Sequence, residues 1–138
     1  MTAAAKAETV RAAGAAETLD REAELPADTY DAVIDVVGGP RWGELILAVK
    51  PGGAYAVSGA IAGPIVEADL RQIYLRDITI HGCTYQPPEV FRRLASLINA
   101  GRLKPLISKS YPLQDIARAQ EDFMSKALPG KLVLIPPE

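Results

Sequence analysis

The chain has 138 residues, of which 49% are hydrophobic and 23% are charged, and its formal net charge is −2. These totals are typical of one soluble globular domain, and the mixed charges argue against a nucleic-acid-binding surface or a polybasic membrane-binding segment. Cys83 is the only cysteine and His81 the only histidine, so the chain can form neither a disulfide framework nor a Cys/His metal site. The sequence shows neither a signal peptide nor an apolar run of the ~20 residues that span a membrane. We therefore expect a cytoplasmic protein.

The first thirty residues predict one helix and little else. Alanines together with Lys6, Glu8 and Arg11 favour a helix over residues 3–13. Residues 17–20 predict a very short strand. Residues 21–29 are charged and contain a proline, which indicates a surface loop or a single helical turn.

The stretch from residue 30 to residue 60 has the pattern of a β-α-β unit. Residues 32–37 are apolar except for Asp35 and mostly β-branched, which favours a parallel strand buried on both faces. A glycine pair ends this strand, and an amphipathic helix is then predicted from Trp42 to Val49, with a Pro-Gly-Gly turn after it. A second strand follows over residues 54–57. Asp35 inside the first strand is expected to be a hydrogen-bonded structural carboxylate rather than a catalytic base.

The remaining segments alternate between helices and extended runs. The predicted order is a loop at 61–65, a helix at 67–75, a strand at 78–83, a helix at 89–100, an extended segment at 103–111, a helix at 112–126 and a strand at 131–135. Within the strand at 78–83, His81 is expected to be an ordinary strand side chain. Cys83 is expected to be a small buried hydrophobic residue.

Six segments, in this order and spacing, carry a resemblance to a known family. They are KAETVRAAGA (6–15), YDAVIDVVGG (30–39), VKPGGAYAVSGA (49–60), ITIHGCT (78–84), GRLKPLISKSYPLQDIARAQEDF (101–123) and GKLVLIP (130–136). The order resembles the C-terminal part of the medium-chain dehydrogenase/reductase superfamily, which contains zinc-type alcohol dehydrogenases and zinc-free quinone oxidoreductases. The resemblance implies an α/β fold, a partial Rossmann-like, doubly wound parallel sheet that lacks its first two strands and has a C-terminal helix and strand. Residues 1–138 would be the C-terminal portion of a dinucleotide-binding domain, and residues 103–138 would return toward an absent catalytic domain.

The family's glycine-rich fingerprint is absent from this chain. In a sheet of strand order 3-2-1-4-5-6, the segments beginning near residues 17, 32, 54 and 78 would be strands 3, 4, 5 and 6. Strand 4 would then present an open, apolar edge. We therefore expect a fragment, and the resemblance implies that it comes from an NAD(P)-dependent oxidoreductase that transfers hydride between nicotinamide and an alcohol, a carbonyl, or a quinone or enone. The isolated chain is expected to bind the dinucleotide weakly or not at all.

The resemblance also implies a cofactor site, for NAD or NADP, at three strand ends. The residues at these ends are Gly38, Gly39, Ser58, Gly59, Ala60, Gly82, Cys83 and Thr84. The corresponding turns of the family line the ribose and the nicotinamide, and main-chain groups near Gly82–Thr84 would hold the carboxamide; the alternative is that these are ordinary turn glycines. Lys6 matches a family lysine that often meets the 2′-phosphate of NADP, although we favour the simpler interpretation of a solvated helix charge. No catalytic residue and no metal ligand is predicted.

Two other functions remain open from the sequence. A class I methyltransferase would also show an Asp-bearing strand, a helix and a Lys-Pro-Gly-Gly turn, and an antiparallel final strand inserted in the sheet would favour it. A degenerate, non-enzymatic interaction module would be favoured by a separate partner chain that carries the missing strands. The segment Ile78–Thr84 is a candidate edge for a homodimer, with an edge covered by the chain's own loops as the alternative.

Overall fold

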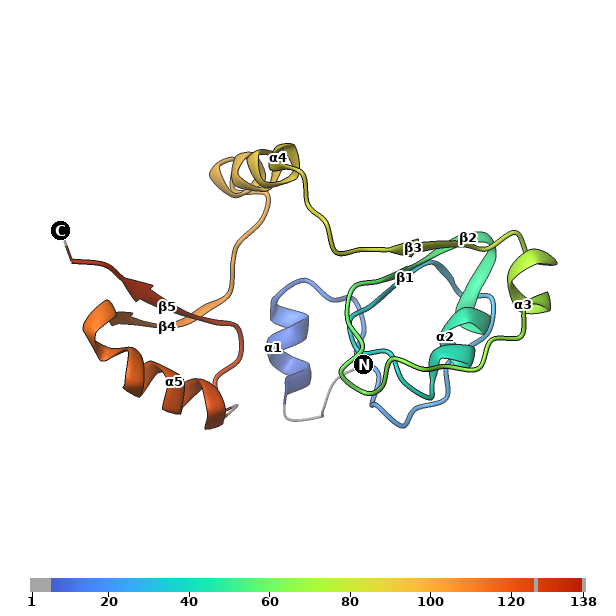
Figure 1. Cartoon of the computed structure of the whole chain (residues 1–138), viewed down its shortest axis with the longest axis horizontal. Coiled ribbons are helices and arrows are strands. Elements are labelled where there is room, and N and C mark those ends of the chain that lie inside the picture. Colours follow the sequence, from blue (N-terminus) through green and yellow to red (C-terminus); the bar gives the residue numbers. More distant parts are fainter. Residues whose placement is uncertain (1–5, 126, 138) are drawn as a thin grey trace. The chain divides into compact units, whose positions relative to one another are not determined.

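Residues 6–125 and 127–137 are described by the computed structural model, in which the chain divides into two units (Figure 1). We call residues 24–86 the sheet unit, and residues 1–23 together with 87–138 the terminal unit. The elements of the sheet unit are β1 (Tyr30–Asp35), α2 (Trp42–Ala48), β2 (Val49–Val57), α3 (Arg71–Tyr74) and β3 (Thr79–Gly82). The elements of the terminal unit are α1 (Ala7–Ala12), α4 (Pro88–Asn99), β4 (Ile107–Pro112), the 3-10 helix η2 (Leu113–Asp115), α5 (Ile116–Ser125) and β5 (Lys131–Ile135).

The sheet unit is built on three parallel strands in the order β1-β2-β3 (Figure 1). This order confirms the prediction that the strands beginning near residues 32, 54 and 78 are neighbours. Within the described residues, β1 pairs only with β2, which confirms the open edge expected there. The predicted strand at 131–135 also forms, and it pairs in parallel with β4 in a separate two-stranded sheet.

The core of the sheet unit lies between the sheet and α2. Ile46, Val49, Tyr55 and Ile78 form its buried cluster, and Trp42 packs edge-on against Tyr55 with ring centroids 6.1 Å apart. Burial of each such side chain stabilises the folded state by about 1.5–3 kcal/mol. The helical stripe predicted from Trp42 to Val49 is therefore confirmed as the face that packs on the sheet.

The prediction that β1 is buried on both faces is wrong. Side chains alternate along a strand, and Val33 and Asp35 point toward the core side while Ile34 is 79% exposed on the other side. The register pairs Ile34 with Ala56 of β2, so this second face is apolar. Only one face of the sheet is covered by α2 and α3, and this explains why half of the apolar run in β1 meets solvent.

The strand ends differ from the prediction for local reasons. β1 ends at Asp35 rather than at Val37, because the Asp35 carboxylate accepts the backbone N–H of Val37 and turns the chain there. β2 begins at Val49, before the Pro-Gly-Gly turn. The pairing skips from Tyr30 opposite Val49 to Ala32 opposite Ala54, so the turn forms a bulge within β2.

Two expected elements are missing or shortened. Residues 17–20 form no strand, because a strand needs a neighbour for its backbone groups and this segment pairs with none of the described strands. The helix expected at 67–75 is reduced to α3, because Asp69 accepts the N–H of Arg71 and starts the helix there. Of its expected apolar face only Ile73 packs on the core, while Leu70 and Tyr74 are exposed.

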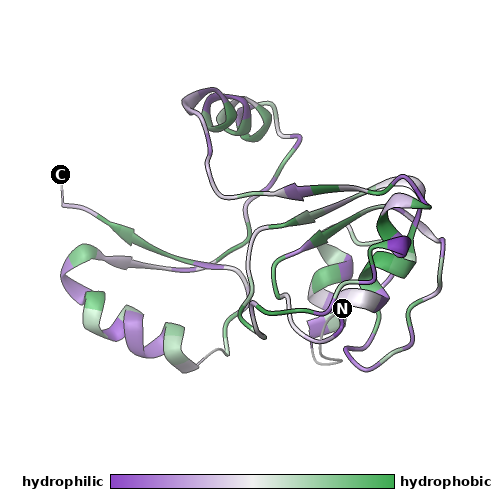
Figure 2. Cartoon of the chain, turned by 45° about the vertical axis from the view of Figure 1, so that its right-hand side comes forward, coloured by the Kyte–Doolittle hydropathy of each residue, from purple (hydrophilic) through white to green (hydrophobic). Residues whose placement is uncertain are grey.

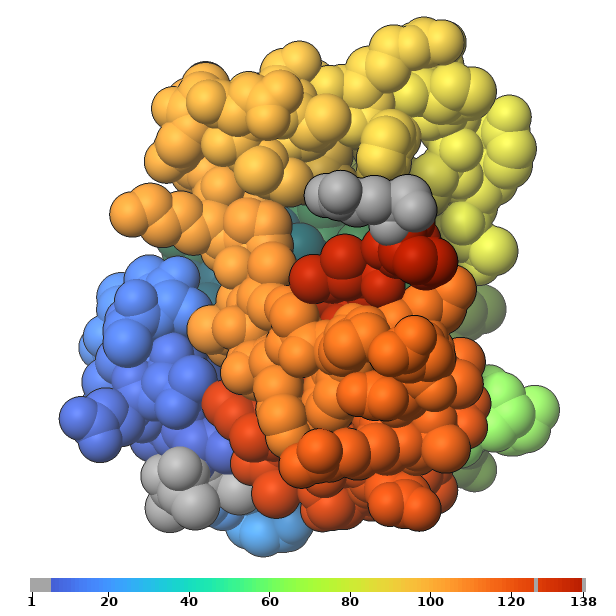
Figure 3. Space-filling model, turned by 90° about the vertical axis from the view of Figure 1, so that its left-hand side faces the viewer, coloured from blue at the N-terminus to red at the C-terminus, as the bar shows by residue number. Residues whose placement is uncertain are grey.

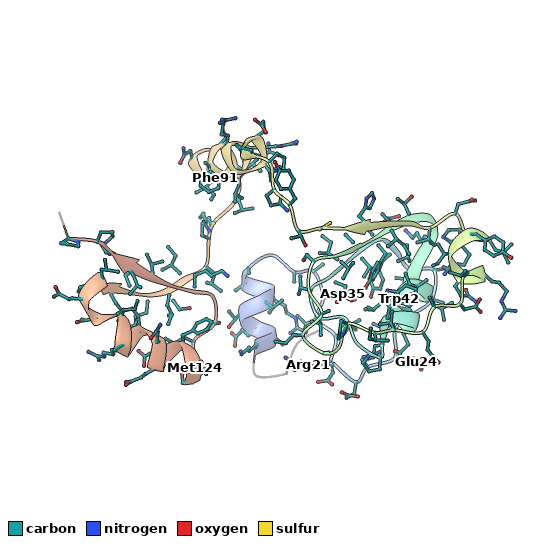
Figure 4. All side chains as sticks on the ribbon, in the orientation of Figure 1. Arg21, Glu24, Asp35, Trp42, Phe91 and Met124 are labelled. Atoms are coloured by element: carbon teal, nitrogen blue, oxygen red, sulfur yellow. The ribbon has the colours of Figure 1, made fainter. Side chains whose placement is uncertain are left out.

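The helices of the terminal unit bury little. The helix predicted at 89–100 forms as α4, yet none of its apolar stripe is fully buried, and Phe91 is 70% exposed (Figure 4). Along the predicted inner side of α5 only Ala119 is buried, although the helix shows clear purple and green faces (Figure 2). A two-stranded sheet with one helix has too little apolar surface to enclose such side chains.

The segment β4-α5-β5 forms a continuous orange-to-red lobe in Figure 3, in which β5 pairs with β4 and a polar cluster joins α5 to β4. The Tyr111 hydroxyl donates a hydrogen bond to the Asp122 carboxylate, and the Lys109 ammonium lies 2.8 Å from the same carboxylate. The Lys109 ammonium also lies 4.7 Å from the centre of the Tyr111 ring. These contacts fix α5 against β4.

Candidate cofactor site

The carboxyl ends of β1, β2 and β3 lie side by side at one edge of the sheet. The Ser58 N–H donates to the Asp35 carbonyl oxygen at 2.9 Å, which joins the ends of β2 and β1. The Cys83 N–H donates to the Val57 carbonyl oxygen at 2.8 Å, which joins the ends of β3 and β2. All the predicted cofactor-binding residues except Lys6 therefore share this edge.

The first two turns pack backbone against backbone. Gly38 and Gly39 have φ angles of +64° and +87°, a region that glycine adopts at no steric cost. A Cβ atom on Gly39 would lie 2.8 Å from the Ala62 Cβ, and one on Gly59 would lie 2.6 Å from the Val36 carbonyl oxygen. These glycines are thus needed for the contact between the turns.

The third turn differs, because a Cβ atom on Gly82 would meet no atom within 4 Å. Gly82 and Thr84 are exposed, as is Ser58 at the end of β2. The edge formed by these three residues is open to solvent and accessible to a ligand.

The two remaining predictions for the third strand have different outcomes. His81 is a side chain of β3, as predicted, and the structure shows it to be exposed. The expectation that Cys83 is buried is wrong: its side chain is half-buried, because it follows the end of an edge strand that lacks a covering helix.

Asp35 is the buried polar residue of this edge, and it is labelled with Trp42 in Figure 4. Its side chain is 5% exposed. Its Oδ1 accepts the N–H groups of Val37 at 2.8 Å and Gly38 at 3.0 Å, and its Oδ2 accepts the Tyr55 hydroxyl at 2.6 Å. The prediction of a hydrogen-bonded structural carboxylate is confirmed.

The electrostatics of this pair oppose an acid–base role. Burial raises the pKa of the Asp35 carboxyl, but the hydrogen bonds from Tyr55, Gly38 and Val37 outweigh it and leave that pKa below its ordinary value. Burial, and then the hydrogen bond to Asp35, raise the pKa of the Tyr55 phenol well above its ordinary value. At neutral pH Asp35 stays charged and Tyr55 stays neutral, so the pair is a fixed donor and acceptor rather than a proton relay.

Lys6 belongs to the terminal unit, whereas the other predicted cofactor-binding residues belong to the sheet unit. It is exposed and immediately precedes α1. It lines an apolar cavity of about 480 Å³ in that unit, together with side chains such as Phe123, Met124 and Leu132.

The sequence did not reveal two contributors to the edge. Tyr55 pairs with Asp35 across twenty residues, and no local pattern marks such a partner. Ala62 closes the contact with Gly39, and its N–H donates to the Val37 carbonyl oxygen at 2.9 Å. The neighbouring Gly63-Pro64 pair was a usable signal for a tight turn at that point.

The residues that the structure describes offer no set of ligands for a zinc ion. Within residues 6–125 and 127–137, no three His, Cys, Asp or Glu side chains cluster in a way that would hold a metal ion.

In the same part of the chain, every helix is too short or too polar to cross a bilayer.

Comparison with known proteins identifies relatives that carry this fold. The chain is 30% identical over 116 residues to YogA, a zinc-type alcohol dehydrogenase-like protein of Leptosphaeria maculans, which covers 80% of the chain and 32% of that protein. A thermostable alcohol dehydrogenase from Pyrobaculum aerophilum superposes with a TM-score of 0.75 at 32% identity, over 95% of the chain and 39% of its own. The Bacillus subtilis protein yhfP, solved with NAD bound, shares the fold with a TM-score of 0.80 at 24% identity, over 96% of the chain and 45% of its own.

These matches confirm the superfamily resemblance and the partial Rossmann-like fold. The chain spans between 32% and 41% of the length of the curated relatives it matches. The family model described as zinc-binding dehydrogenase matches residues 8–134, nearly the whole chain. The chain therefore belongs to the zinc-binding dehydrogenase family.

Proposed function

We propose that the chain is the C-terminal portion of the dinucleotide-binding domain of an NAD(P)-dependent oxidoreductase. The whole enzyme would transfer hydride between nicotinamide and an alcohol, a carbonyl, or a quinone or enone. The observation that carries this proposal is the meeting of three turns at the carboxyl edge of a parallel sheet, which is where open α/β sheets bind ligands. Family membership supports it, as does the NAD bound to a protein of the same fold.

The residues of the edge would divide the work of holding the cofactor. The turns at Gly38–Gly39 and Ser58–Ala60 would line the ribose, and main-chain groups of Gly82–Thr84 would hold the carboxamide. The open space at Gly82 supports this assignment, because a ligand can approach the backbone there. The bound nicotinamide supplies the hydride chemistry, while this chain binds and orients it.

Several finer parts of the proposal rest on the resemblance. Lys6 is the candidate for the 2′-phosphate if the cofactor is NADP. Residues 103–138 would return toward the catalytic domain. Their strands β4 and β5 pair in a sheet of their own, which supports a role for this segment separate from that of the main sheet. The exposed strand β3 supports Ile78–Thr84 as a homodimer edge. A cytoplasmic location is proposed on the composition alone.

The methyltransferase alternative draws no support from the strand directions. It would be favoured by an antiparallel final strand inserted in the main sheet. The last described strand, β5, instead pairs in parallel with β4.

Chemical-shift mapping of the isolated chain with NADH and NADPH tests the proposal. The sequence alone leaves open weak binding or none. Because the three turns meet within this chain, we propose weak binding, and because the chain supplies only part of the site, we expect a Kd on the order of 1 mM. The shift changes should be confined to residues 38–39, 58–60 and 82–84. An absence of shift changes at about ten times that concentration, or changes confined to the terminal unit, would contradict the proposal.

A matched variant sharpens this experiment. In Gly82→Val the new side chain meets open space, so the stability should change by no more than about 0.5 kcal/mol. The same side chain would fill the space proposed for the carboxamide, and the shifts at residues 82–84 induced by NADH should be lost. Undiminished binding by this variant would remove Gly82 from the site.

A further inference from the structure

We infer that Asp35 is a positioning residue, one that holds the Val36–Gly39 turn in the shape that the dinucleotide needs. The inference rests on the proposed function, because it assigns a role within the same site. It goes beyond that proposal because Asp35 would touch no ligand. The residue is buried inside the sheet edge and acts on the site only through the turn that follows it.

The two oxygens of the Asp35 carboxylate have separate tasks. Oδ1 accepts the N–H groups of Val37 and Gly38, and so fixes the backbone immediately before the two glycines with positive φ. Oδ2 accepts the hydroxyl of Tyr55 from β2, while the two N–H groups on Oδ1 hold the carboxylate toward the turn without this bond. One side chain therefore ties the turn to the core.

The first turn, which Oδ1 holds, also positions the second turn at Ser58–Ala60. The Val37 carbonyl oxygen accepts the N–H of Ala62, and Gly38 lies so close to Ala60 that a Cβ on it would approach the Ala60 Cα to 3.0 Å. A displacement of the first turn would thus displace the segment that carries Ser58, Gly59 and Ala60. Both ribose-lining turns depend on the same two hydrogen bonds to Oδ1.

Tyr55 provides the matched control. Tyr55→Phe removes the donor to Oδ2 but leaves both turn hydrogen bonds in place. Asp35→Ala removes the acceptor for both turn N–H groups and for the hydroxyl. Both variants lose buried hydrogen bonds and should be less stable than the wild type, so a difference between them in ligand binding reports positioning rather than stability.

The test measures NADH affinity by chemical-shift titration for four proteins: the wild type, Tyr55→Phe, Asp35→Ala and Asp35→Asn. The conditions are those in which Trp42 fluorescence shows each variant to be folded. We expect Asp35→Ala to bind at least five-fold more weakly, and Tyr55→Phe to bind within two-fold of the wild type. Asp35→Asn keeps an Oδ1 acceptor and should restore most of the affinity. The amide proton signals of Val37 and Gly38 should move in Asp35→Ala but stay in place in Tyr55→Phe.

The outcomes separate the two claims. If the wild type binds but Asp35→Ala binds equally well, or if Tyr55→Phe weakens binding as much as Asp35→Ala, the positioning role is refuted while the proposed function stands. If the wild type shows no binding, the proposed function fails and this inference fails with it. If Asp35→Ala does not fold, it is replaced by Asp35→Thr, which keeps one short acceptor. The NADH affinity of Asp35→Thr should be lower than that of the wild type but still measurable. Wild-type affinity in that variant would overturn the inference.

Discussion

Replacing Ile46 with alanine should bring the sheet unit close to unfolding. Ile46 is 1% exposed and packs in the cluster with Val49, Tyr55 and Ile78. Truncation of a buried isoleucine to alanine costs about 2–5 kcal/mol, which includes the cavity that it leaves. A unit of this size has a total stability of roughly 3–9 kcal/mol, so the substitution removes a large part of it.

The next residue of the same helix supplies the control. Leu47 is 41% exposed, and Leu47→Ala should change the free energy of unfolding far less than Ile46→Ala. Urea titration followed by the fluorescence of Trp42, the only tryptophan, reports this unit selectively because the indole packs on Tyr55. Equal losses in the urea midpoint for the two variants would refute the assignment of the core to this face of α2.

Four further predictions test other features of the structure. Gly39→Ala should be more destabilising than Gly52→Ala in urea titrations, because both glycines have positive φ but only the first leaves no room for a Cβ. Arg76→Ala should lower the urea midpoint by an amount equivalent to about 1–3 kcal/mol, because the guanidinium donates to three carbonyl oxygens at the end of α2. The folded state lowers the pKa of the Asp35 carboxyl, so the stability that this carboxylate adds is present above pH ~4 and is lost as the pH falls below it. The urea midpoint of Asp35→Asn should therefore vary less with pH between about 5 and 2 than that of the wild type. Ile34→Lys should raise the monomer fraction in sedimentation experiments, because Ile34 is exposed beside the unpaired edge of β1.

The sequence predicted the fold best where a periodic pattern met a clear stop signal. The strand, helix and strand between residues 30 and 57 formed in the expected order, as did α4 and β5. Periodicity shows that a segment has an apolar face but not whether a partner covers it. Ile34 and Phe91 therefore follow the expected pattern and still face solvent.

The parts that sequence reasoning missed depend on contacts between distant residues. The C-terminal end of α2 is satisfied by Arg76, which lies about thirty positions further along the chain. The Asp35 carboxylate finds the Tyr55 hydroxyl in the same way. Residues 17–20 have the composition of a strand but no neighbouring strand among the described residues, and local preference cannot replace those missing hydrogen bonds.

The glycines of the proposed site have two different roles, close packing between turns and open space for a ligand, which a sequence pattern cannot distinguish. Gly39 and Gly59 are required by the protein itself, because a Cβ at either position would collide with the neighbouring turn. Gly82 is under no such requirement, since the space beside it is open. Substitution at Gly39 or Gly59 should therefore reduce stability and binding together, whereas substitution at Gly82 should reduce binding alone. This difference in outcome between Gly82 and the other two glycines separates a loss of ligand contact from a loss of packing.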